Sequence, residues 1–424
     1  MSCNLPNGWE ELELSEFINF NPKETIKKGT VCKSIPMACL MEFCKNISEY
    51  EEKEFKGGTK FRNGDTLFAR ITPCLENGKT AFVDFLDEDE VAFGSTEYIV
   101  LREKEKVSDK DFIYYLSISP QFREIAIKSM TGSSGRQRVQ NDVLFRENFI
   151  LPLDINEQKR IADILSAFDD KIELNNQMNQ TLEEMATALF KEWFENFNFP
   201  NSDGKAYKDN GGEMKASELG EIPIDWGLNS LDKLSQTISK GTTPRKKDVE
   251  GLKNSIGFLK VKDISDSGII NIGSLEKIPK EVHEKQLKRS ILKVDDILIS
   301  IAGTIGRVSI VPNELENSNC NQAIAFIRLK DKEKYKKYIY QWIRTSTIQN
   351  QIESSIVQGV QANVSLTTLS NLQVIIPDDI TMDRFNDTFS PIFEQIQQNQ
   401  QQNQTLKKQR DTLLPKLLSG EIRV

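Results

Sequence analysis

The sequence predicts an α+β protein in which two mixed strand-and-helix domains are separated by two long antiparallel coiled-coil helices, with a pseudo-two-fold internal repeat. The repeat is visible directly, because Asn179-Gln180-Thr181-Leu182 recurs word for word as Asn403-Gln404-Thr405-Leu406. The same spacing of apolar residues surrounds both copies, and similar strand and helix signals precede each of them. A repeat of about half the chain is far longer than the roughly 20–50 residues of solenoid periods. It indicates one unit, a globular segment followed by a long helix, that occurs twice.

Changes in pattern divide the chain into five parts. We expect a first globular domain at 1–155, a first long helix at 156–198, a linker at 199–214, a second globular domain at 215–378, and a second long helix with a C-terminal tail at 379–424. Pro200, Gly204 and Gly211 mark the linker, because proline and glycine interrupt regular structure.

The two globular segments show the same signals in the same order. Both open on a phrase with proline before tryptophan, Leu5-Pro6-Asn7-Gly8-Trp9 and Ile222-Pro223-Ile224-Asp225-Trp226. Matching strands are expected at 64–71 and 295–301, at 78–83 and 306–311, and at 149–152 and 374–377, and matching helices at 111–127 and 335–356. A loop rich in glycine or glutamine follows each of these helices. We therefore expect one mixed fold in both segments.

The long helices carry apolar residues at alternating spacings of four and three, which is the seam of a coiled coil. The residues expected to pair the helices are Ile161, Leu165, Phe168, Ile172, Asn175, Asn179, Leu182, Leu189, Phe389, Ile392, Ile396, Asn399, Asn403, Leu406 and Leu413. The asparagines at matching seam positions reduce stability but can fix the register. Because one chain supplies both helices, we expect antiparallel intramolecular pairing. Pro391 lies inside the second helix, so we expect a kink there or a later start of that helix.

Composition favours a cytoplasmic protein without membrane contact. No apolar run of the sequence approaches the roughly 18–20 residues that span a bilayer, and the N-terminus lacks the blocks of a signal peptide. The six cysteines form no Cys-x-x-Cys pair, so we expect free thiols.

The net charge of −8 is unevenly distributed. Residues 1–155 carry 20 Lys and Arg against 26 Asp and Glu, whereas residues 215–378 carry 23 against 19. Because phosphate contacts depend on local clusters of cations, the acidic total is compatible with DNA binding. It argues only against strong non-specific binding by the chain alone.

The sequence lacks a recognisable catalytic constellation. Its single histidine, His283, excludes His-based triads and two-His metal helices, and we expect it to be a solvated surface residue. Gly78-Lys79-Thr80 resembles the end of a phosphate-binding loop, but Pro73 stands where that motif needs glycine. We therefore expect no catalytic residue, metal site or cofactor site in this chain, which favours a binding protein.

The candidate DNA contacts come in paired loops. Counted back from Pro152 and Pro377, Arg138 of the first loop matches Asn363 of the second. Arg, Gln and Asn can bind base edges with two hydrogen bonds, and Lys and hydroxyl side chains suit phosphates. The full set is Lys60, Arg62, Lys79, Ser134, Arg136, Gln137, Arg138, Lys240, Thr242, Thr243, Arg245, Lys246, Lys247, Arg307, Gln358, Gln361 and Asn363. A polar surface loop or a solvated charge run is the open alternative for each residue.

Four phrases together make the chain similar to a known family. They are Asn156-Glu157-Gln158-Lys159-Arg160-Ile161-Ala162-Asp163-Ile164-Leu165, Gly220-Glu221-Ile222-Pro223 followed by Trp226, Lys240-Gly241-Thr242-Thr243-Pro244, and Leu414-Pro415-Lys416-Leu417-Leu418-Ser419-Gly420-Glu421-Ile422. In this order, with the duplicated segments and long helices, nearly the whole chain resembles the specificity subunit of type I restriction-modification systems. One departure is that the second helix opens with Thr381-Met382-Asp383-Arg384-Phe385.

The resemblance implies a non-catalytic subunit that binds double-stranded DNA. In such proteins each target-recognition domain reads one half of a split target, and the paired helices set the gap and dock two methyltransferase subunits. Restriction subunits with motor activity then join. The resemblance further implies that S-adenosylmethionine for N6-adenine methylation, and ATP with Mg²⁺ for cleavage, bind in those partners. Because the loops of the two segments differ, we expect an asymmetric target.

Two alternatives stay open. One is a specificity subunit of a methylation-only or phage-defence system without a restriction motor, which neighbouring genes would distinguish. The other is a coiled-coil scaffold whose globular segments bind protein, which predicts no sequence-dependent DNA protection by the assembled complex.

Overall fold

The computed structural model describes residues 6–47, 49–133, 135–356 and 363–424, without the side chains of Lys246 and Ser274. The first globular segment contains strands β1 (Trp9–Glu13), β2 (Ile18–Phe20), β3 (Val31–Ile35), β4 (Glu51–Glu54), β5 (Thr59–Phe61), β6 (Thr66–Ala69), β7 (Thr80–Phe82), β8 (Ala92–Gly94), β9 (Tyr98–Glu103) and β10 (Asn148–Pro152), and helices α1 (Leu14–Phe17), α2 (Lys110–Ile118), α3 (Pro120–Lys128) and α4 (Asn141–Phe145). The second contains strands β11 (Met214–Ser217), β12 (Gly220–Pro223), β13 (Gly227–Ser230), β14 (Ser235–Lys240), β15 (Asn254–Leu259), β16 (Glu276–Pro279), β17 (Ile297–Ser300), β18 (Val308–Ile310), β19 (Asn319–Cys320), β20 (Ile324–Leu329) and β21 (Gln373–Ile376), and helices α6 (Leu231–Leu234), α7 (Lys246–Val249), α8 (Lys280–Lys285), α9 (Lys332–Arg344), α10 (Ser346–Ser354) and α11 (Leu366–Asn371). The long helices are α5 (Ile155–Phe190) and α12 (Asp379–Leu418).

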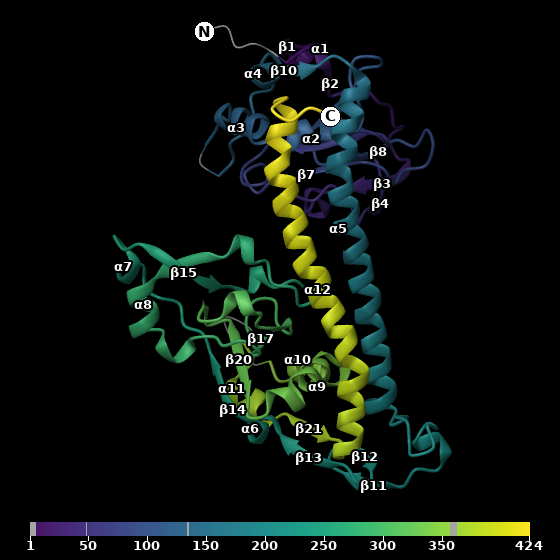
Figure 1. Ribbon diagram of the computed structural model, residues 1–424, viewed down its shortest axis with the longest axis vertical. Helices are drawn as coiled ribbons and strands as arrows, with labels where there is room; N and C mark the ends of the chain where they lie inside the picture. The colour runs from purple at the N-terminus through teal and green to yellow at the C-terminus, as the bar shows by residue number, and fades with distance from the viewer. Residues whose placement is uncertain (1–5, 48, 134, 357–362) are drawn as a thin grey trace. The chain divides into compact units, whose positions relative to one another are not determined.

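The chain folds into two compact units, and each unit includes part of both long helices. The first unit is Met1–Gln177 with Gln398–Val424, and the second is Met178–Gln397. Each unit thus combines one globular segment, the start of the long helix that follows it, and the end of the other long helix (Figure 1). The α+β class and the internal repeat expected from the sequence are confirmed.

The sheets of the two units repeat each other. A four-stranded antiparallel sheet has the order β2-β9-β6-β7 in the first unit and β14-β20-β17-β18 in the second. A second sheet contains one parallel pair in each unit, β3 with β8 and β15 with β19. The first strand of each segment pairs antiparallel with its last, β1 with β10 and β13 with β21. The strands expected from the sequence are therefore all present, at equivalent places in the two segments.

A buried ion pair occupies the same place in both central sheets. Arg102 Nε and Nη2 donate to the Asp65 carboxylate at 2.6 and 2.7 Å. Arg328 Nε and Nη2 donate to the Asp296 carboxylate at 2.8 and 2.6 Å. Each aspartate also accepts the backbone N–H of the residue three positions before it. Buried charges need such partners, so the duplication extends from the backbone to its side-chain bonds.

The helical region after each central sheet consists of two helices, and not of one as expected. Ser119 ends α2 and caps α3, because its hydroxyl accepts the Phe122 N–H at 3.2 Å, and Pro120 then occupies the first turn of α3. Thr345 caps α10 in the same way, accepting the Ile348 N–H at 3.5 Å. The apolar periodicity continues across both breaks, so it predicted a single helix in each domain. The N-cap residues determine where the second helix begins.

Helix α12 begins at Asp379 and continues through Pro391. Of the two alternatives expected, a kink at Pro391 or a later start of the helix, the later start does not occur. Asp378 explains the early start, because its carboxylate accepts the N–H and the hydroxyl of Thr381 at 3.0 and 2.7 Å, as a helix N-cap does. Pro391 lies on the exposed face, where water can satisfy the carbonyl that the missing N–H leaves open.

Helices α5 and α12 pack antiparallel in the first unit, as expected. Asn175 Nδ2 donates to Asn403 Oδ1 at 2.8 Å. Asp169, earlier on α5, pairs with Arg410, later on α12. Among the expected seam residues, Ile161, Leu165, Ile172, Asn175, Asn179, Phe389, Asn399 and Asn403 are buried, and Phe168, Leu182, Leu189, Ile392, Ile396, Leu406 and Leu413 are half-buried. The buried asparagine pair is of the kind that fixes the register of a coiled coil.

The C-terminal end of α12 completes the core of the first unit. Leu414 and Leu417 are 4% and 1% exposed and share a cluster with Trp9 and Phe112. Figure 1 shows this yellow end of the chain beside α2. The core of the first domain is therefore built from residues at opposite ends of the sequence.

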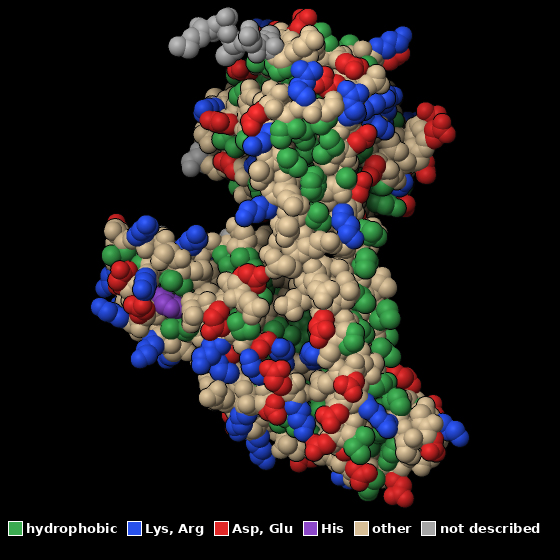
Figure 2. All heavy atoms as spheres, viewed as in Figure 1, with side chains coloured by type: hydrophobic (Ala, Val, Ile, Leu, Met, Phe, Trp, Pro, Cys, Tyr) green, Lys and Arg blue, Asp and Glu red, His purple; other side chains and the backbone are tan. Residues whose placement is uncertain are grey.

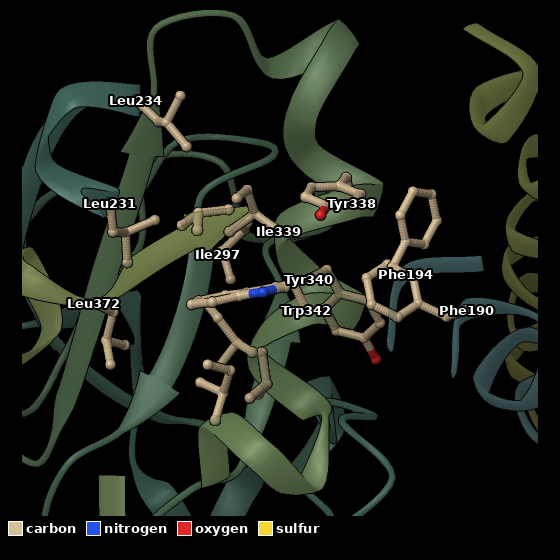
Figure 3. Close-up of a cluster of buried hydrophobic side chains, with 14 of the residues drawn as sticks. Phe190, Phe194, Leu231, Leu234, Ile297, Tyr338, Ile339, Tyr340, Trp342 and Leu372 are labelled. Carbon is tan, nitrogen blue, oxygen red and sulfur yellow. The ribbon is translucent and has the colours of Figure 1, made fainter. Parts of the chain in front are cut away.

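The C-terminal end of α5 is anchored in the second unit by aromatic packing. The rings of Phe190 and Phe194 reach toward Tyr338 of α9, with centroids 5.4 and 5.0 Å away (Figure 3). Directly after Phe190 the helix widens into a π turn, Lys191–Glu195, in which Trp193 and Phe194 are buried. The repeated pattern of seam residues therefore ends differently in the two long helices, with aromatic rings at the end of α5 and leucines at the end of α12.

The segment 199–214 packs on the second unit. Phe199 is 5% exposed and stacks on Tyr207 and Trp226, with ring centroids 4.7 and 4.8 Å apart. Arg384 of α12 donates to the Pro200 carbonyl at 2.7 Å. These contacts hold the residues that join α5 to the second domain.

His283 is buried on α8, so the expectation of a solvated residue is wrong. Its Nδ1 hydrogen-bonds to Asn319 Oδ1, and Asn319 Nδ2 donates to the Leu287 carbonyl at 3.2 Å. The charged neighbours Lys280 and Lys285 lie on the same short helix and hid one inward-facing position from sequence reasoning.

Candidate nucleic-acid interface

The glycine loop of the first domain is fastened to the edge of the central sheet. Arg138 forms backbone bridges with Thr131 across the loop and with Ile71 after β6. The Thr72 N–H donates to the Gln137 carbonyl at 3.0 Å. The ends of the loop are therefore held in place relative to the sheet.

Glycine at position 132 allows the loop to turn tightly. Gly132 has φ +129°, and a Cβ there would lie 3.0 Å from the Arg136 carbonyl oxygen. Such backbone conformations favour glycine. The loop exposes Arg136 and Arg138 and half-buries Gln137, while the candidate Ser134 lies outside the described residues.

Arg138 is held by a carboxylate. Its Nε lies 3.0 and 2.9 Å from the two oxygens of Glu97, and its Nη2 lies 2.6 Å from Oε1. This hydrogen bond is the main reason that the pKa of Glu97 is below its usual range, with the charges of Arg138 and Arg70 adding to it. Glu97 therefore remains ionised and keeps its grip on Arg138 at neutral pH.

Asn363 occupies the position of Arg138 in the second domain. It forms a backbone bridge with Ala302, as Arg138 does with Ile71. The next residue, Val364, donates its N–H to the Ile301 carbonyl at 3.0 Å. The match predicted by counting back from the prolines is thus present in the fold. Asn363 is exposed, and the candidates Gln358 and Gln361 lie outside the described residues.

The basic turn of the second domain begins at a glycine that packs on the backbone. A Cβ at Gly241 would lie 2.1 Å from the Cys320 carbonyl oxygen, so a larger residue cannot fit without movement. Thr242 donates its N–H to the same carbonyl at 3.1 Å, and the Thr243 hydroxyl bonds Gln322. The start of the turn is therefore rigid.

Cations leave this rigid turn toward solvent. Lys240 ends β14, Arg245 and Lys247 are exposed, and Lys246 opens α7 with its side chain outside the described atoms. Figure 2 shows Lys and Arg side chains gathered over α7 and α8. A cluster of cations on one turn is the usual means of binding phosphates.

Three of the proposed phosphate ligands already bond to the protein. Lys60 Nζ donates to the Glu24 carbonyl and Lys79 Nζ to the Met37 carbonyl, both at 2.9 Å. Arg307 donates to the Asp266 carboxylate at 2.7 Å and to two backbone carbonyls. Each would have to give up or share these bonds to hold DNA.

Arg62 lies among acids. It lines a recess with Asp87, Glu88, Asp89 and Glu90, where carboxylates repel a phosphate. The site therefore weakens the case for Arg62 as a phosphate ligand.

A cationic cavity adjoins the loop of the first domain. It has a volume of about 540 Å³, opens to solvent and is lined by Lys23, Lys60 and Arg70, among others. Arg70 Nη2 donates to the Val139 carbonyl at 3.2 Å, which links the cavity to the loop. Within the described residues, the Arg70 Nε and the buried Tyr98 hydroxyl have no hydrogen-bond partner.

Neither metal chemistry nor a membrane span is evident in the part of the chain that the structure describes. No group of three or more His, Cys, Asp or Glu side chains there has the geometry to hold an ion. None of the described helices combines the length and apolar character needed to cross a bilayer.

Comparison with known proteins decides the family. A model described as the type I restriction modification DNA specificity domain matches residues 6–184 and again residues 223–408. The chain belongs to this family. It is a specificity subunit, a member of a group whose function is DNA sequence recognition together with the other subunits of a type I restriction-modification system, and it is not the catalytic subunit of that system.

Individual relatives support the assignment over most of the chain. The type I restriction enzyme HindI specificity subunit of Haemophilus influenzae is 26% identical over 450 residues, covering 94% of this chain and 94% of that protein. The MjaIX specificity subunit of Methanocaldococcus jannaschii is 28% identical over 317 residues, covering 74% of this chain and 69% of that one. A solved type I S subunit from M. genitalium has 15% identity and a TM-score of 0.52, and the match covers 98% of both chains, which shows a common fold.

Sequence reasoning missed Glu97, although it found Arg138. Glu97 stands just before β9, and its backbone carbonyl accepts the Arg70 N–H at 3.0 Å. No spacing in the sequence connects residues 97 and 138, because only the tertiary pairing of β6 with β9 brings them together.

Proposed function

We propose that this specificity subunit reads a bipartite, asymmetric DNA target. Each globular domain contacts one half of the target, and the pair of long helices sets the length of the unread gap and docks two methyltransferase subunits. Restriction subunits with motor activity join that assembly.

The observation that carries the proposal is one scaffold with two different reading positions. Arg138 and Asn363 occupy equivalent bridges at the ends of equivalent loops. Arginine pairs with guanine and asparagine with adenine in the major groove. A common fold with different side chains at the reading edge supports two half-sites of different sequence.

The distribution of cations supports a division of labour within this interface. The turn around Gly241 carries its cations on a rigid base, which suits the phosphate contacts that fix a protein's register on DNA. Because Lys60, Lys79 and Arg307 are bonded within the protein, we give the turn the larger part of the phosphate contacts. The affinity of the complex should then fall steeply with salt concentration.

Catalysis is assigned to the partners. We propose that S-adenosylmethionine for N6-adenine methylation binds in the methyltransferase subunits, and that ATP and Mg²⁺ bind in the restriction subunits. This chain selects the DNA sequence at which the reactions take place, and the partner subunits catalyse them.

The experiment that tests the proposal is a genome-wide map of N6-methyladenine in the source strain with and without this gene. Loss of one split, asymmetric motif on deletion is the expected result and would reveal both half-sites. If no motif depends on the gene, a footprint of the chain reconstituted with its methyltransferase decides between a silent partner and a protein that does not read DNA. Absence of sequence-dependent protection would overturn the proposed function.

A further inference from the structure

The ion pair between Glu97 and Arg138 is not required by the fold. In the second domain the position of Arg138 is taken by Asn363, and the position of Glu97 is taken by Ala323, whose carbonyl accepts the Ile301 N–H at 2.8 Å. The backbone around both positions is the same without an ion pair. An exposed ion pair contributes little stability in general, so a role beyond stability has to explain this one.

The geometry of the pair leaves a specific part of Arg138 available. A guanidinium group has five N–H donors in a planar fork. Glu97 occupies the edge formed by Nε and Nη2. Among the described residues, Nη1 has no hydrogen-bond partner, so the end of the fork, with Nη1 and the second hydrogen of Nη2, faces away from Glu97. Two parallel N–H groups of this kind match O6 and N7 of guanine.

The acid also explains why the fork is ready to bind. The Arg138 side chain is 45% exposed, whereas that of Glu97 is 22% exposed. Glu97 is anchored through its backbone to Arg70, and so is the residue after Arg138, because the Val139 N–H donates to the Arg70 carbonyl at 2.9 Å. An arginine held in this way loses little rotamer freedom when it binds a base. A carboxylate at a DNA-binding edge repels phosphates, so its presence is favourable only if it orients the arginine.

We propose that Glu97 is a positioning residue that holds the Arg138 guanidinium as an outward-facing fork, and that this fork reads one guanine in the first half of the target. The inference rests on the proposed function and adds to it the identity of one base and the residue that orients its reader. Asn363 offers an amide at the same place, so the second half-site has no such guanine contact there.

The test uses the full-length chain expressed from its own locus, with methylated motifs mapped as above. Arg138→Ala should relax one guanine position of the first half-site by roughly 5- to 150-fold in preference, as expected for one lost bidentate contact. Glu97→Gln should reduce preference at that same position, because the neutral amide holds the guanidinium less firmly. The second half-site and the gap should stay unchanged in both variants.

The matched control is Glu124→Gln, which removes an exposed ion pair with Lys128 on α3 in the same domain and should leave the motif intact. Thermal unfolding of each variant checks that the fold is retained. Uniform loss of methylation at all sites in Arg138→Ala would mark a phosphate contact and overturn the inference, as would relaxation at a position other than guanine. If the motif depends on the gene but Glu97→Gln leaves it unaltered, the inference fails while the proposed function stands.

Discussion

Asp65 shows how strongly one residue depends on another at the centre of each domain. Its side chain has 0% exposure, and Arg102, with 10% exposure, neutralises it. The equivalent Asp296 has 1% exposure and pairs with Arg328. Burial removes water from both charges. The pair is therefore important for stability mainly because the loss of either partner would leave the other charge buried and unpaired.

We therefore expect Arg102→Met to lower the free energy of unfolding of the first unit by about 3–5 kcal/mol, because it leaves the Asp65 carboxylate buried and unpaired. The double variant Asp65→Asn with Arg102→Met removes the buried Asp65 charge and should recover part of the loss. The recovery should be incomplete, because Glu24, to which Arg102 also donates at 2.6 Å, still loses its partner. Hydrogen exchange in β6 and β9 measures the effect, with β17 and β20 of the second unit as internal control. Equal protection in the single variant and the unmodified chain would contradict this account.

At the scale of elements, the start of α12 depends on Asp378. Its carboxylate accepts bonds from Thr381 and, at 3.1 Å, from the indole Nε1 of Trp226. Although burial acts to raise it, these hydrogen bonds lower the pKa of Asp378 below its usual range. Trp9 bonds in a similar way to Glu157, in the first turn of α5, also at 3.1 Å. A tryptophan thus ties each domain to the start of its own long helix.

Asp378→Ala should destabilise the second unit by about 1 kcal/mol, the usual cost of losing an N-cap. Because the pKa is lowered in the folded state, this contribution is present above the unfolded value of about 3.9 and is lost as pH falls through the lower folded value. Urea unfolding at pH 7 and near pH 3 should therefore show a difference between variant and unmodified chain that shrinks in acid. Asp383→Ala, at an exposed position of the same helix, is the control, because Asp379 is paired with Lys334; a difference that grows in acid would contradict the assignment.

The paired helices give a second prediction at this scale. Deleting 176–182 from α5 together with 396–402 from α12 removes one heptad from each helix and keeps the Asn175–Asn403 bond. Seven residues correspond to about 10 Å of helix, or up to about three base pairs. The methylated motif should keep both half-sites with a shorter gap. An altered half-site sequence would show that the helices do more than measure distance.

Features that depend on near neighbours in the sequence were predicted better than features that depend on distant residues. The strands and the asparagine ladder follow from local alternation and heptad spacing, which are set by each residue's near neighbours. The equivalence of Arg138 and Asn363 could be counted because both loops lead into a strand that ends near a proline. The break at Ser119 was missed although its signals, a capping serine followed by Pro120, are local, because the apolar periodicity runs across it. The burial of His283 was missed because it depends on Asn319, which comes from elsewhere in the chain. The Glu97–Arg138 pair was missed for the same reason.

At the scale of the whole molecule, the two units exchange helix ends. The first unit takes the last residues of α12, while the second takes the last residues of α5. Asp169 and Arg410 form a buried pair in the first unit. In the internal repeat, Asp169 corresponds to Phe393 and Arg410 corresponds to Ala186. The second unit thus has two apolar residues at the positions of this ion pair. The two copies therefore differ at these matching positions, one pair being charged and the other apolar. A helix paired with a second copy of itself would place Asp169 opposite Ala186, or Arg410 opposite Phe393, and would leave a buried charge unpaired.

One helix should accordingly report on both units. Leu417→Ala removes a side chain that is 1% exposed in the core of the first unit, and Phe389→Ala removes one that is 0% exposed in the core of the second. Each should cost about 2–5 kcal/mol, because a buried cavity replaces packed atoms. Hydrogen exchange should show faster opening of β6 and β9 in Leu417→Ala, and of β17 and β20 in Phe389→Ala. In the assembled complex, Leu417→Ala should weaken recognition of the first half-site, although it lies near the end of the sequence that follows the second domain. Equal effects of the two substitutions on both sheets would mean that the units open as one body, and that the exchange of helix ends does not separate them energetically.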